Sequence, residues 1–155
     1  MNQISSKSLF ITKKVFPLLW FGFLAFFIGN SIMGGAYVKA PVFLVIPSLM
    51  AVFGFFLMKK IVWDLADQVY DGGDFLLVRK SGEEDRVPLS NIMNVSASTN
   101  MNPPRITLRL VRPGKFGPEI SFSPAAPFTL NPFAKNPVAE DLIVRVDKAR
   151  SNRAR

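Results

Sequence analysis

The chain has 155 residues, of which 49% are hydrophobic and 19% charged, and its formal net charge is +8. It contains no cysteine, which excludes disulfides, thiolate metal sites and a cysteine nucleophile. It also contains no histidine, the commonest metal ligand and the usual general base near neutral pH. The composition therefore favours a protein without catalytic activity.

The positive charge is unevenly distributed. Residues 1–60 carry six lysines and no acidic residue, whereas residues 61–155 carry 13 Lys or Arg against 11 Asp or Glu. A nucleic-acid-binding domain usually gathers its basic residues on one face of the fold. Because the excess charge precedes the balanced part of the chain, we expect no nucleic-acid partner.

Two long uncharged stretches follow a short N-terminal segment, residues 1–14. Residues 15–38 and residues 40–58 contain no charged side chain, and Lys39 alone separates them. A helix needs ~20 predominantly apolar residues to cross the hydrocarbon core of a bilayer. The sequence therefore predicts a transmembrane helical hairpin over residues 15–60, surrounded by a lipid bilayer.

Lysines flank this hairpin at both ends. Lys13 and Lys14 precede the first stretch, Lys59 and Lys60 follow the second, and we expect all four to anchor the hairpin at the membrane surface. Positively charged flanks mark the cytoplasmic side, so both termini are predicted to be cytoplasmic. A cleaved signal peptide is the alternative for the basic start, but the apolar region of a signal peptide has only ~7–15 residues.

Small residues and the lack of charge constrain what the hairpin can do. Ala25 and Gly29 form a small-xxx-small pair, which permits close packing of helices. Ion pathways normally contain an ionisable residue within the membrane, and neither stretch has one. We therefore do not expect the hairpin alone to form a channel or a transporter.

Residues 61–150 are long enough for one small domain with several short strands. Turn signals at Asp71–Asp74 (DGGD) and Ser81–Gly82 separate short apolar runs, a pattern typical of an antiparallel meander. The clearest strand is predicted from Arg105 to Val111, where apolar and polar residues alternate. A turn at Arg112–Lys115 and a second strand over Pro118–Phe122 should follow.

The last part of the chain changes to a helical period. Asn136 is a suitable N-cap and Pro137 suits the first helical position. The apolar stripe of this amphipathic helix consists of Val138, Leu142, Val146 and Ala149. Residues 151–155 are predicted to be a frayed basic tail.

This order of elements carries a family resemblance. Three segments contribute to it: DGGDFLLVRKSGEEDRVPLSNIMNVS (71–96), NPPRITLRL (102–110) and NPVAEDLIVRVDKA (136–149). Following a two-span hairpin, they resemble the bacterial membrane-bound pleckstrin-homology-like (PH-like) domain. The resemblance implies a membrane protein with two transmembrane α-helices and a small α+β PH-like domain, in which a helix closes a bent antiparallel sheet or barrel.

The same resemblance implies a binding or scaffolding role at the bacterial inner membrane, with no catalytic residue and no cofactor. Eukaryotic relatives often bind phosphoinositides through a basic first hairpin loop. The comparable loop here, residues 80–85 (KSGEED), is net acidic, which argues against recognition of inositol lipids.

A basic set within the predicted domain is the strongest candidate for a lipid- or partner-binding surface. It consists of Arg105, Arg109, Arg112 and Lys115. The set has three interpretations: a solvent-exposed face that keeps the sheet soluble, a contact with anionic lipid headgroups, or a docking face for an acidic protein. Near a membrane surface, each such charge contributes ~1 kcal/mol to binding.

Four phenylalanines near the last predicted strand also have two interpretations. They are Phe116, Phe122, Phe128 and Phe133. They can form an exposed apolar patch for a partner, or they can pack beneath the sheet, which we favour.

The sequence contains none of the nucleotide- or metal-binding motifs that we considered. It contains neither G-x-G-x-x-G nor a P-loop, and it has no calcium-binding loop pattern. Gly72–Phe75 (GGDF) superficially matches a signalling-cyclase signature, but we interpret it as a turn. We expect no small-molecule substrate, cofactor or metal.

Together these observations predict a non-catalytic binding or assembly module that is anchored in the membrane and acts at its cytoplasmic face. Its expected partners are a second copy of itself or another membrane protein. The alternative is an accessory subunit of a larger membrane enzyme or transporter.

Overall fold

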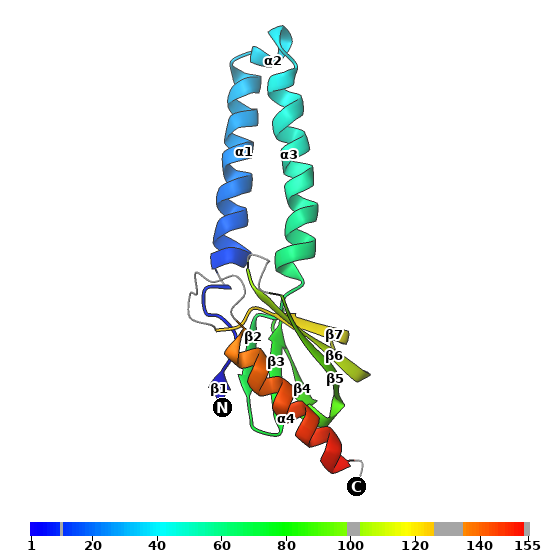
Figure 1. The fold of residues 1–155 in the computed structure, drawn as a ribbon. Coiled ribbons are helices and arrows are strands. Elements are labelled where there is room, and N and C mark those ends of the chain that lie inside the picture. The colour runs from blue at the N-terminus through cyan, green and yellow to red at the C-terminus, as the bar shows by residue number, and fades with distance from the viewer. Residues whose placement is uncertain (10, 99–102, 126–134, 154–155) are drawn as a thin grey trace. The chain divides into compact units, whose positions relative to one another are not determined.

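The computed structural model of the chain describes residues 1–9, 11–98, 103–125 and 135–153. Contacts within the chain divide it into two units. We call Phe10–Asp64 the helical hairpin, and Met1–Leu9 together with Leu65–Arg155 the sheet domain (Figure 1). The sheet domain is thus assembled from sequence on both sides of the hairpin.

Two long helices make up most of the helical hairpin, Ile11–Met33 and Val42–Trp63. Their parts in chain order are η1 (Ile11–Val15), α1 (Phe16–Met33), the short α2 (Ala36–Lys39) between them, α3 (Val42–Met58) and η2 (Lys59–Trp63), where η1 and η2 are π-helical turns. Both long helices are apolar and long enough to cross a membrane, as predicted. Each extends beyond the uncharged stretch to include the flanking lysines.

The two helices approach each other at a glycine. A Cβ atom on Gly54 of α3 would lie 2.9 Å from Nε1 of Trp20 on α1, so only glycine leaves room for the indole ring. Ala25 and Gly29 are not at this contact: Ala25 is exposed, and a Cβ on Gly29 would meet no atom within 4 Å, so close packing of this pair stays a prediction. The sequence pattern marked small residues on α1, whereas the contact uses the small residue on α3.

Two serine hydroxyls within the hairpin are bonded to its own backbone, whereas the buried Nε1 of Trp20 has no hydrogen-bond partner among the described residues. The hydroxyl of Ser31 donates to the Phe27 carbonyl (2.9 Å) and that of Ser48 to the Leu44 carbonyl (2.7 Å). Such bonds satisfy hydroxyl groups that would otherwise be costly in an apolar environment.

The sheet domain contains two antiparallel sheets and one long helix (Figure 1). The first sheet has the order β1-β2-β3-β4 and the second β5-β6-β7. The strands are β1 (Asn2–Gln3), β2 (Gln68–Asp71), β3 (Phe75–Lys80), β4 (Glu83–Pro88), β5 (Ile92–Ser98), β6 (Arg105–Gly114) and β7 (Gly117–Phe122); a 3-10 turn, η3 (Leu89–Asn91), joins the sheets. The predicted meander is confirmed from β2 to β4.

The two predicted turns of this meander have the expected backbone geometry. Ser81 and Gly82 join β3 to β4, and both have positive φ (54° and 84°). A two-residue hairpin loop with two positive φ angles matches the right-handed twist of the flanking strands. In the preceding turn Gly73 has φ 93°, a conformation that favours glycine.

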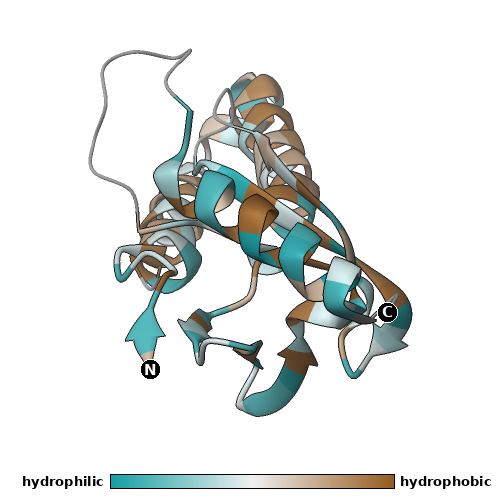
Figure 2. Ribbon diagram, turned by 60° about the horizontal axis from the view of Figure 1, so that its bottom comes forward, coloured by the Kyte–Doolittle hydropathy of each residue, from teal (hydrophilic) through white to brown (hydrophobic). Residues whose placement is uncertain are grey.

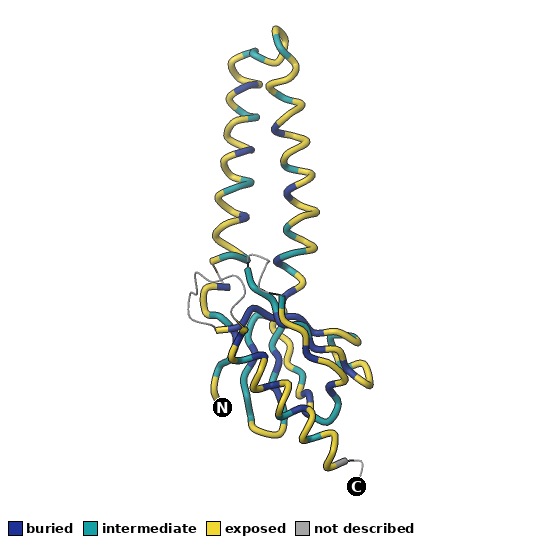
Figure 3. The backbone as a smooth tube through the Cα atoms, in the orientation of Figure 1, coloured by how far each residue is buried: buried dark blue, intermediate teal, exposed yellow. Residues whose placement is uncertain are grey.

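Apolar side chains from both sheets and from the C-terminal helix α4 (Pro137–Arg153) form one core. Figure 3 shows buried residues along the strands of this domain, whereas most of the hairpin is exposed. In β6 the side chains of Ile106, Leu108 and Leu110 are buried, which confirms the predicted alternation. Phe122 on β7 is completely buried beside them.

The N-terminal segment joins the two sheets. Beyond the pairing of β1 with β2, the amide of Ile4 donates to the Val69 carbonyl (2.9 Å) and the amide of Ser6 to the Ser123 carbonyl (2.8 Å). The buried hydroxyl oxygen of Ser5 accepts the amide of Val69 (2.9 Å). Residues that precede the hairpin are therefore held by strands that follow it, an arrangement that the sequence analysis did not predict.

Helix α4 begins as predicted and ends later. The side-chain oxygen of Asn136 accepts the amides of Val138 (3.0 Å) and Ala139 (3.3 Å), which confirms it as the N-cap. The helix continues to Arg153, so the prediction of a frayed tail from residue 151 is wrong for residues 151–153. In Figure 2 this helix shows apolar residues between polar ones, as expected for an amphipathic helix.

The predicted turn at Arg112–Lys115 is displaced. Strand β6 extends to Gly114, and the turn consists of Lys115 and Phe116, followed by Gly117 with φ 97°. The sequence Pro113-Gly114 is typical of a turn, but the pairing of Gly114 with Gly117 continues the ladder after an irregularity.

Two of the four phenylalanines pack with the core, as favoured. Phe122 is buried and Phe116 packs partly buried against the same core. Phe128 and Phe133 lie outside the described residues.

Candidate binding surface

Strand β6 positions the basic set along one side of the second sheet. Because side chains alternate along a strand, the burial of Ile106 and Leu108 directs Arg105, Thr107 and Arg109 to the opposite face. The cross-strand register places Thr107 opposite Ser121 and Arg109 opposite Glu119 of β7. This face is therefore polar, as the sequence predicted.

The basic set does not converge on one point. Arg105 is the first residue of β6, whereas Lys115 lies in the turn after its last residue. Since a strand rises about 3.3 Å per residue, their backbones are on the order of 30 Å apart. One small anionic group cannot contact both residues.

Acidic neighbours neutralise part of the set. The guanidinium of Arg109 donates to Glu119 Oε1 from Nη2 (2.6 Å) and from Nε (2.9 Å). Lys115 Nζ lies 3.5 Å from Glu83 Oε2, and the amide of Lys115 donates to Asp85 Oδ2 (2.7 Å). These groups are exposed, and exposed pairs typically contribute less than ~1 kcal/mol to stability. Their effect is to reduce the positive potential that would attract a lipid headgroup.

Arg112 is held through its backbone. The side chain of Asn91, in η3, makes two hydrogen bonds to the Arg112 backbone, both 3.0 Å long. Its Nδ2 donates to the Arg112 carbonyl, and its Oδ1 accepts the Arg112 backbone N–H. This two-bond contact fixes the end of β6 to the junction between the sheets and leaves the Arg112 side chain exposed. Binding by the basic set, whether to lipid or to protein, stays a prediction.

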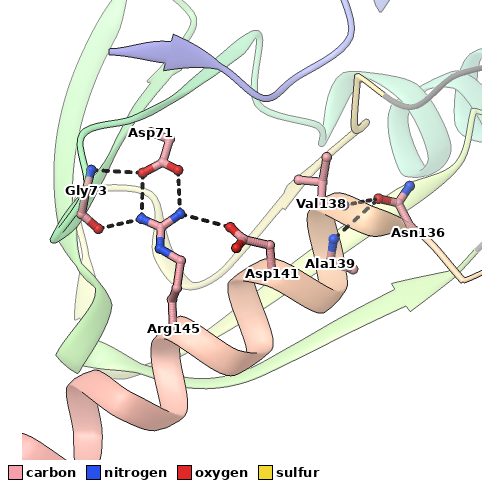
Figure 4. Close-up of polar contacts among 7 residues, drawn as sticks. All are labelled: Asp71, Gly73, Asn136, Val138, Ala139, Asp141 and Arg145. Atoms are coloured by element: carbon pink, nitrogen blue, oxygen red, sulfur yellow. Dashed lines mark hydrogen bonds and ion pairs between the residues drawn. The ribbon is translucent and has the colours of Figure 1, made fainter.

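The least exposed ion pair among the described residues involves other side chains. Arg145 of α4 forms a two-bond ion pair with Asp71 at the end of β2, with Nη2 2.8 Å from Oδ1 (Figure 4). It also bonds Asp141 on its own helix (3.0 Å) and the Gly73 carbonyl. The side chains of Asp71 and Arg145 are only 18% and 26% exposed.

This contact shifts the pKa values of both side chains. The hydrogen bond from Arg145 lowers the pKa of Asp71, and the bond from the Gly73 amide (2.9 Å) acts in the same direction. In return, Asp71 raises the pKa of Arg145. Because Asp71 and Arg145 are 74 residues apart, the contact fastens α4 to the β2–β3 turn. An open polar depression lined by Asn2, Asp71, Asp74 and Arg145 lies beside it.

Sequence reasoning missed this contact for a clear reason. The DGGD segment by itself indicates only a turn, and the segment around Arg145 indicates only an amphipathic helix. The local signal, an acidic residue at the end of a strand before two glycines, indicates a turn equally well, and nothing local identifies an arginine so distant in the chain.

The predicted anchor lysines lie at one end of the helical hairpin. Lys13 and Lys14 belong to η1, and Lys59 and Lys60 belong to η2. Trp63 Nε1 donates to the Lys13 carbonyl (3.2 Å), so the start of the first helix and the end of the second are in contact. Whether these lysines contact lipid headgroups stays a prediction.

Among the described residues, no three His, Cys, Asp or Glu side chains lie close enough to hold a metal ion. Comparison with known proteins found no matching protein family, no matching curated protein and no matching solved structure.

Proposed function

We propose that the chain is a non-catalytic binding or assembly module, anchored by its helical hairpin in the bacterial inner membrane, with the sheet domain on the cytoplasmic face. The observation that carries the proposal is that segments from both sides of the hairpin build the sheet domain. Met1–Leu9 and Leu65–Arg155 form one unit, so the chain before and after the hairpin must lie on the same side of any membrane that the hairpin crosses. A pair of membrane-crossing helices meets that requirement, and one crossing does not.

The order of elements supports a PH-like fold. A four-stranded antiparallel sheet precedes a three-stranded one, and a C-terminal helix packs against the core formed by both. Such a domain offers surfaces rather than a reactive centre, and a chain without histidine or cysteine fits a binding role. The hairpin confines the domain to one plane, which raises its effective concentration for partners in the same membrane.

The topology can be tested with single cysteines, because the chain has none. Val38→Cys lies between the long helices and Ser151→Cys near the end of α4, and both positions are exposed. With a membrane-impermeant maleimide, we expect Val38→Cys to be labelled in intact cells and Ser151→Cys only after permeabilisation. Labelling of Ser151→Cys in intact cells would overturn the cytoplasmic placement. A purified chain that stays monodisperse without detergent would overturn the membrane anchor.

One observation favours the accessory-subunit alternative. The helical hairpin has an apolar groove of about 320 Å³ between its helices, lined in part by Phe23, Phe27, Phe43 and Met50. A helix of a larger membrane complex could fill this groove. Mild detergent extraction followed by native mass measurement separates the two functions, because a stoichiometric complex with other chains supports the subunit and a homo-oligomer supports the module.

A further inference from the structure

The described part of the sheet domain has four outer strands, and the edge of one of them is less protected than the others. The outer strands are β1 and β4 in the first sheet and β5 and β7 in the second. An outer strand presents unpaired backbone groups that can pair with another chain. Soluble proteins usually prevent this by making the strand short, placing charges or proline on it, or covering it.

Three outer strands show these protections. Strand β1 has only two residues. Strand β4 contains four consecutive charged residues, Glu83–Arg86, and ends in Pro88. Strand β7 is covered, because its Ser121 carbonyl accepts the amide of Ala66 (2.7 Å) and the Ser123 carbonyl beyond it accepts the amide of Ser6 (2.8 Å).

Among the residues that the structure describes, strand β5 lacks this kind of protection apart from one contact at its start. Its seven residues, Ile92–Ser98 (IMNVSAS), include neither a charge nor a proline. At its start, Arg150 Nη1 of α4 donates to the Met93 carbonyl (3.2 Å). Farther along, Asn94, Ser96 and Ala97 are exposed, and the side chain of Met93 itself is 43% exposed.

One exposed apolar residue of α4, Ile143, lies on the side of the helix nearest β5. It is 41% exposed, and the exposed Asp147 and Arg150 lie on the same side. Ile143 precedes Arg150 by seven residues, so both lie on the same side of the helix. Arg150 contacts β5, whereas Arg145 points to the β2–β3 turn (Figure 4). Ile143 therefore flanks β5 rather than the first sheet.

We propose that β5 pairs with β5 of a second copy of this chain. The proposal rests on the assembly role proposed above and names the surface and the partner. An uncharged strand can lie antiparallel to its own copy across a two-fold axis without opposing like charges, whereas pairing of β4 would gather the acidic Glu83–Asp85 of both copies at one edge. Pairing would join the two three-stranded sheets into one of six strands and bring Ile143 of both copies toward the joined edge.

The size of this contact predicts where it forms. One pair of seven-residue strands and a few apolar side chains fall at the low end of protein interfaces, below ~1,200 Å². Such a contact is weak in dilute solution and is favoured when both copies are confined to one membrane. We therefore expect the dimer in membranes more than in detergent.

Disulfide cross-linking of the full chain in native membranes tests this directly, because every introduced cysteine is the only one. Asn94→Cys and Ser96→Cys lie on either side of the middle of β5. In an antiparallel two-fold pair the residue at the axis lies close to its own copy, so the two variants sample two registers. Disulfide formation requires Cβ atoms within about 4.5 Å. The matched control is Glu84→Cys, exposed on the outer strand β4.

We expect a mild oxidant to convert at least one β5 variant largely into dimer, at least fivefold more than Glu84→Cys. Adding Ser96→Lys to Asn94→Cys should reduce the cross-link at least fivefold, because each copy would bring a positive charge to the joined edge. Unchanged hydrogen exchange of β6 amides would show that the domain still folds.

Cross-linking of β5 no greater than that of β4, or an adduct of β5 with a different protein, would overturn self-pairing. Native mass measurement distinguishes this failure from failure of the proposed function. A dimer that persists without a β5 cross-link refutes the assigned edge and retains the assembly role. A chain that is monomeric in membranes and binds no other protein refutes both.

Discussion

The helical hairpin and the sheet domain place similar side chains in opposite environments (Figure 3). Phe26 in the hairpin is 74% exposed, whereas Phe122 in the sheet domain is fully buried. The sheet domain is stabilised by apolar burial away from water. In the hairpin, by contrast, the hydroxyls of Ser31 and Ser48 bond to the helix backbone and many apolar side chains are exposed, which fits the proposed membrane anchor. The same substitution should therefore have different consequences in the two regions.

The largest difference is expected for removal of a phenylalanine. Phe122→Ala should lower the free energy of unfolding of the sheet domain by ~3–5 kcal/mol, because it leaves a cavity in a closed core. Phe26→Ala is the matched control and should change it very little. Hydrogen exchange of β6 amides in urea, with the full chain in detergent, measures both. Equal effects of the two substitutions would contradict the contrast.

Packing inside the hairpin can be tested at its closest contact. Gly54→Ile should destabilise the contact between α1 and α3 by ~1–3 kcal/mol, because its Cβ would meet the Trp20 ring at 2.9 Å. Gly29→Ile serves as the control, since a Cβ there meets no atom within 4 Å. Emission of Trp20 in a Trp63→Phe background should shift only in the Gly54 variant. A matching shift for Gly29→Ile would place the helix contact elsewhere.

The pair between Asp71 and Arg145 predicts how stability depends on pH. Because the pKa of Asp71 is lower in the folded state, its stabilising effect is complete above the ordinary carboxyl value, about 4, and is lost as the pH falls through the lowered pKa. Asp71→Asn should therefore cost ~1–3 kcal/mol at pH 7 and weaken the loss of stability on acidification.

Urea titrations of the sheet domain of the full chain at pH 7 and below pH 4 test this. Glu119→Gln is a control from an exposed pair. A stability difference between Asp71→Asn and the unaltered chain that does not change with pH would show that the ion pair contributes nothing.

The smallest effect is expected on the outer face of β6. Arg109→Ala removes an exposed pair with Glu119 and should change the free energy of unfolding by less than ~1 kcal/mol, with the difference shrinking in high salt because solvent ions screen the pair. The same urea titrations with and without added salt measure it. A larger loss that persists in salt would indicate a structural role for this residue.

Local patterns predicted much of the sheet domain. The alternation of β6, the turn at Ser81–Gly82 and the cap at Asn136 each depend on residues close together in the sequence, and each was found in the structure. The two apolar helices were equally evident, because a long uncharged stretch needs no distant partner.

Features that depend on distant partners were missed. Strand β1 consists of Asn2 and Gln3, which show no strand pattern by themselves and become a strand only by pairing with β2. The extension of β6 through Pro113 and Gly114 also depends on the neighbouring strand, since these two residues normally favour a turn. The candidate binding surface was only partly predictable for the same reason: the basic residues were visible, but Glu83 and Glu119 became their neighbours only through folding.

The attachment of the N-terminal segment also constrains the order of events during synthesis. Ser6 leaves the ribosome first, but Ser123, whose carbonyl accepts its amide, follows 117 positions later. At ~5–20 residues per second, translation takes on the order of ten seconds to cover that interval. If the two long helices enter a bilayer, as proposed, the N-terminal segment must stay unpaired on the side where Ser123 later emerges. If the N-terminal segment were instead carried across the membrane, the finished sheet domain would lack β1.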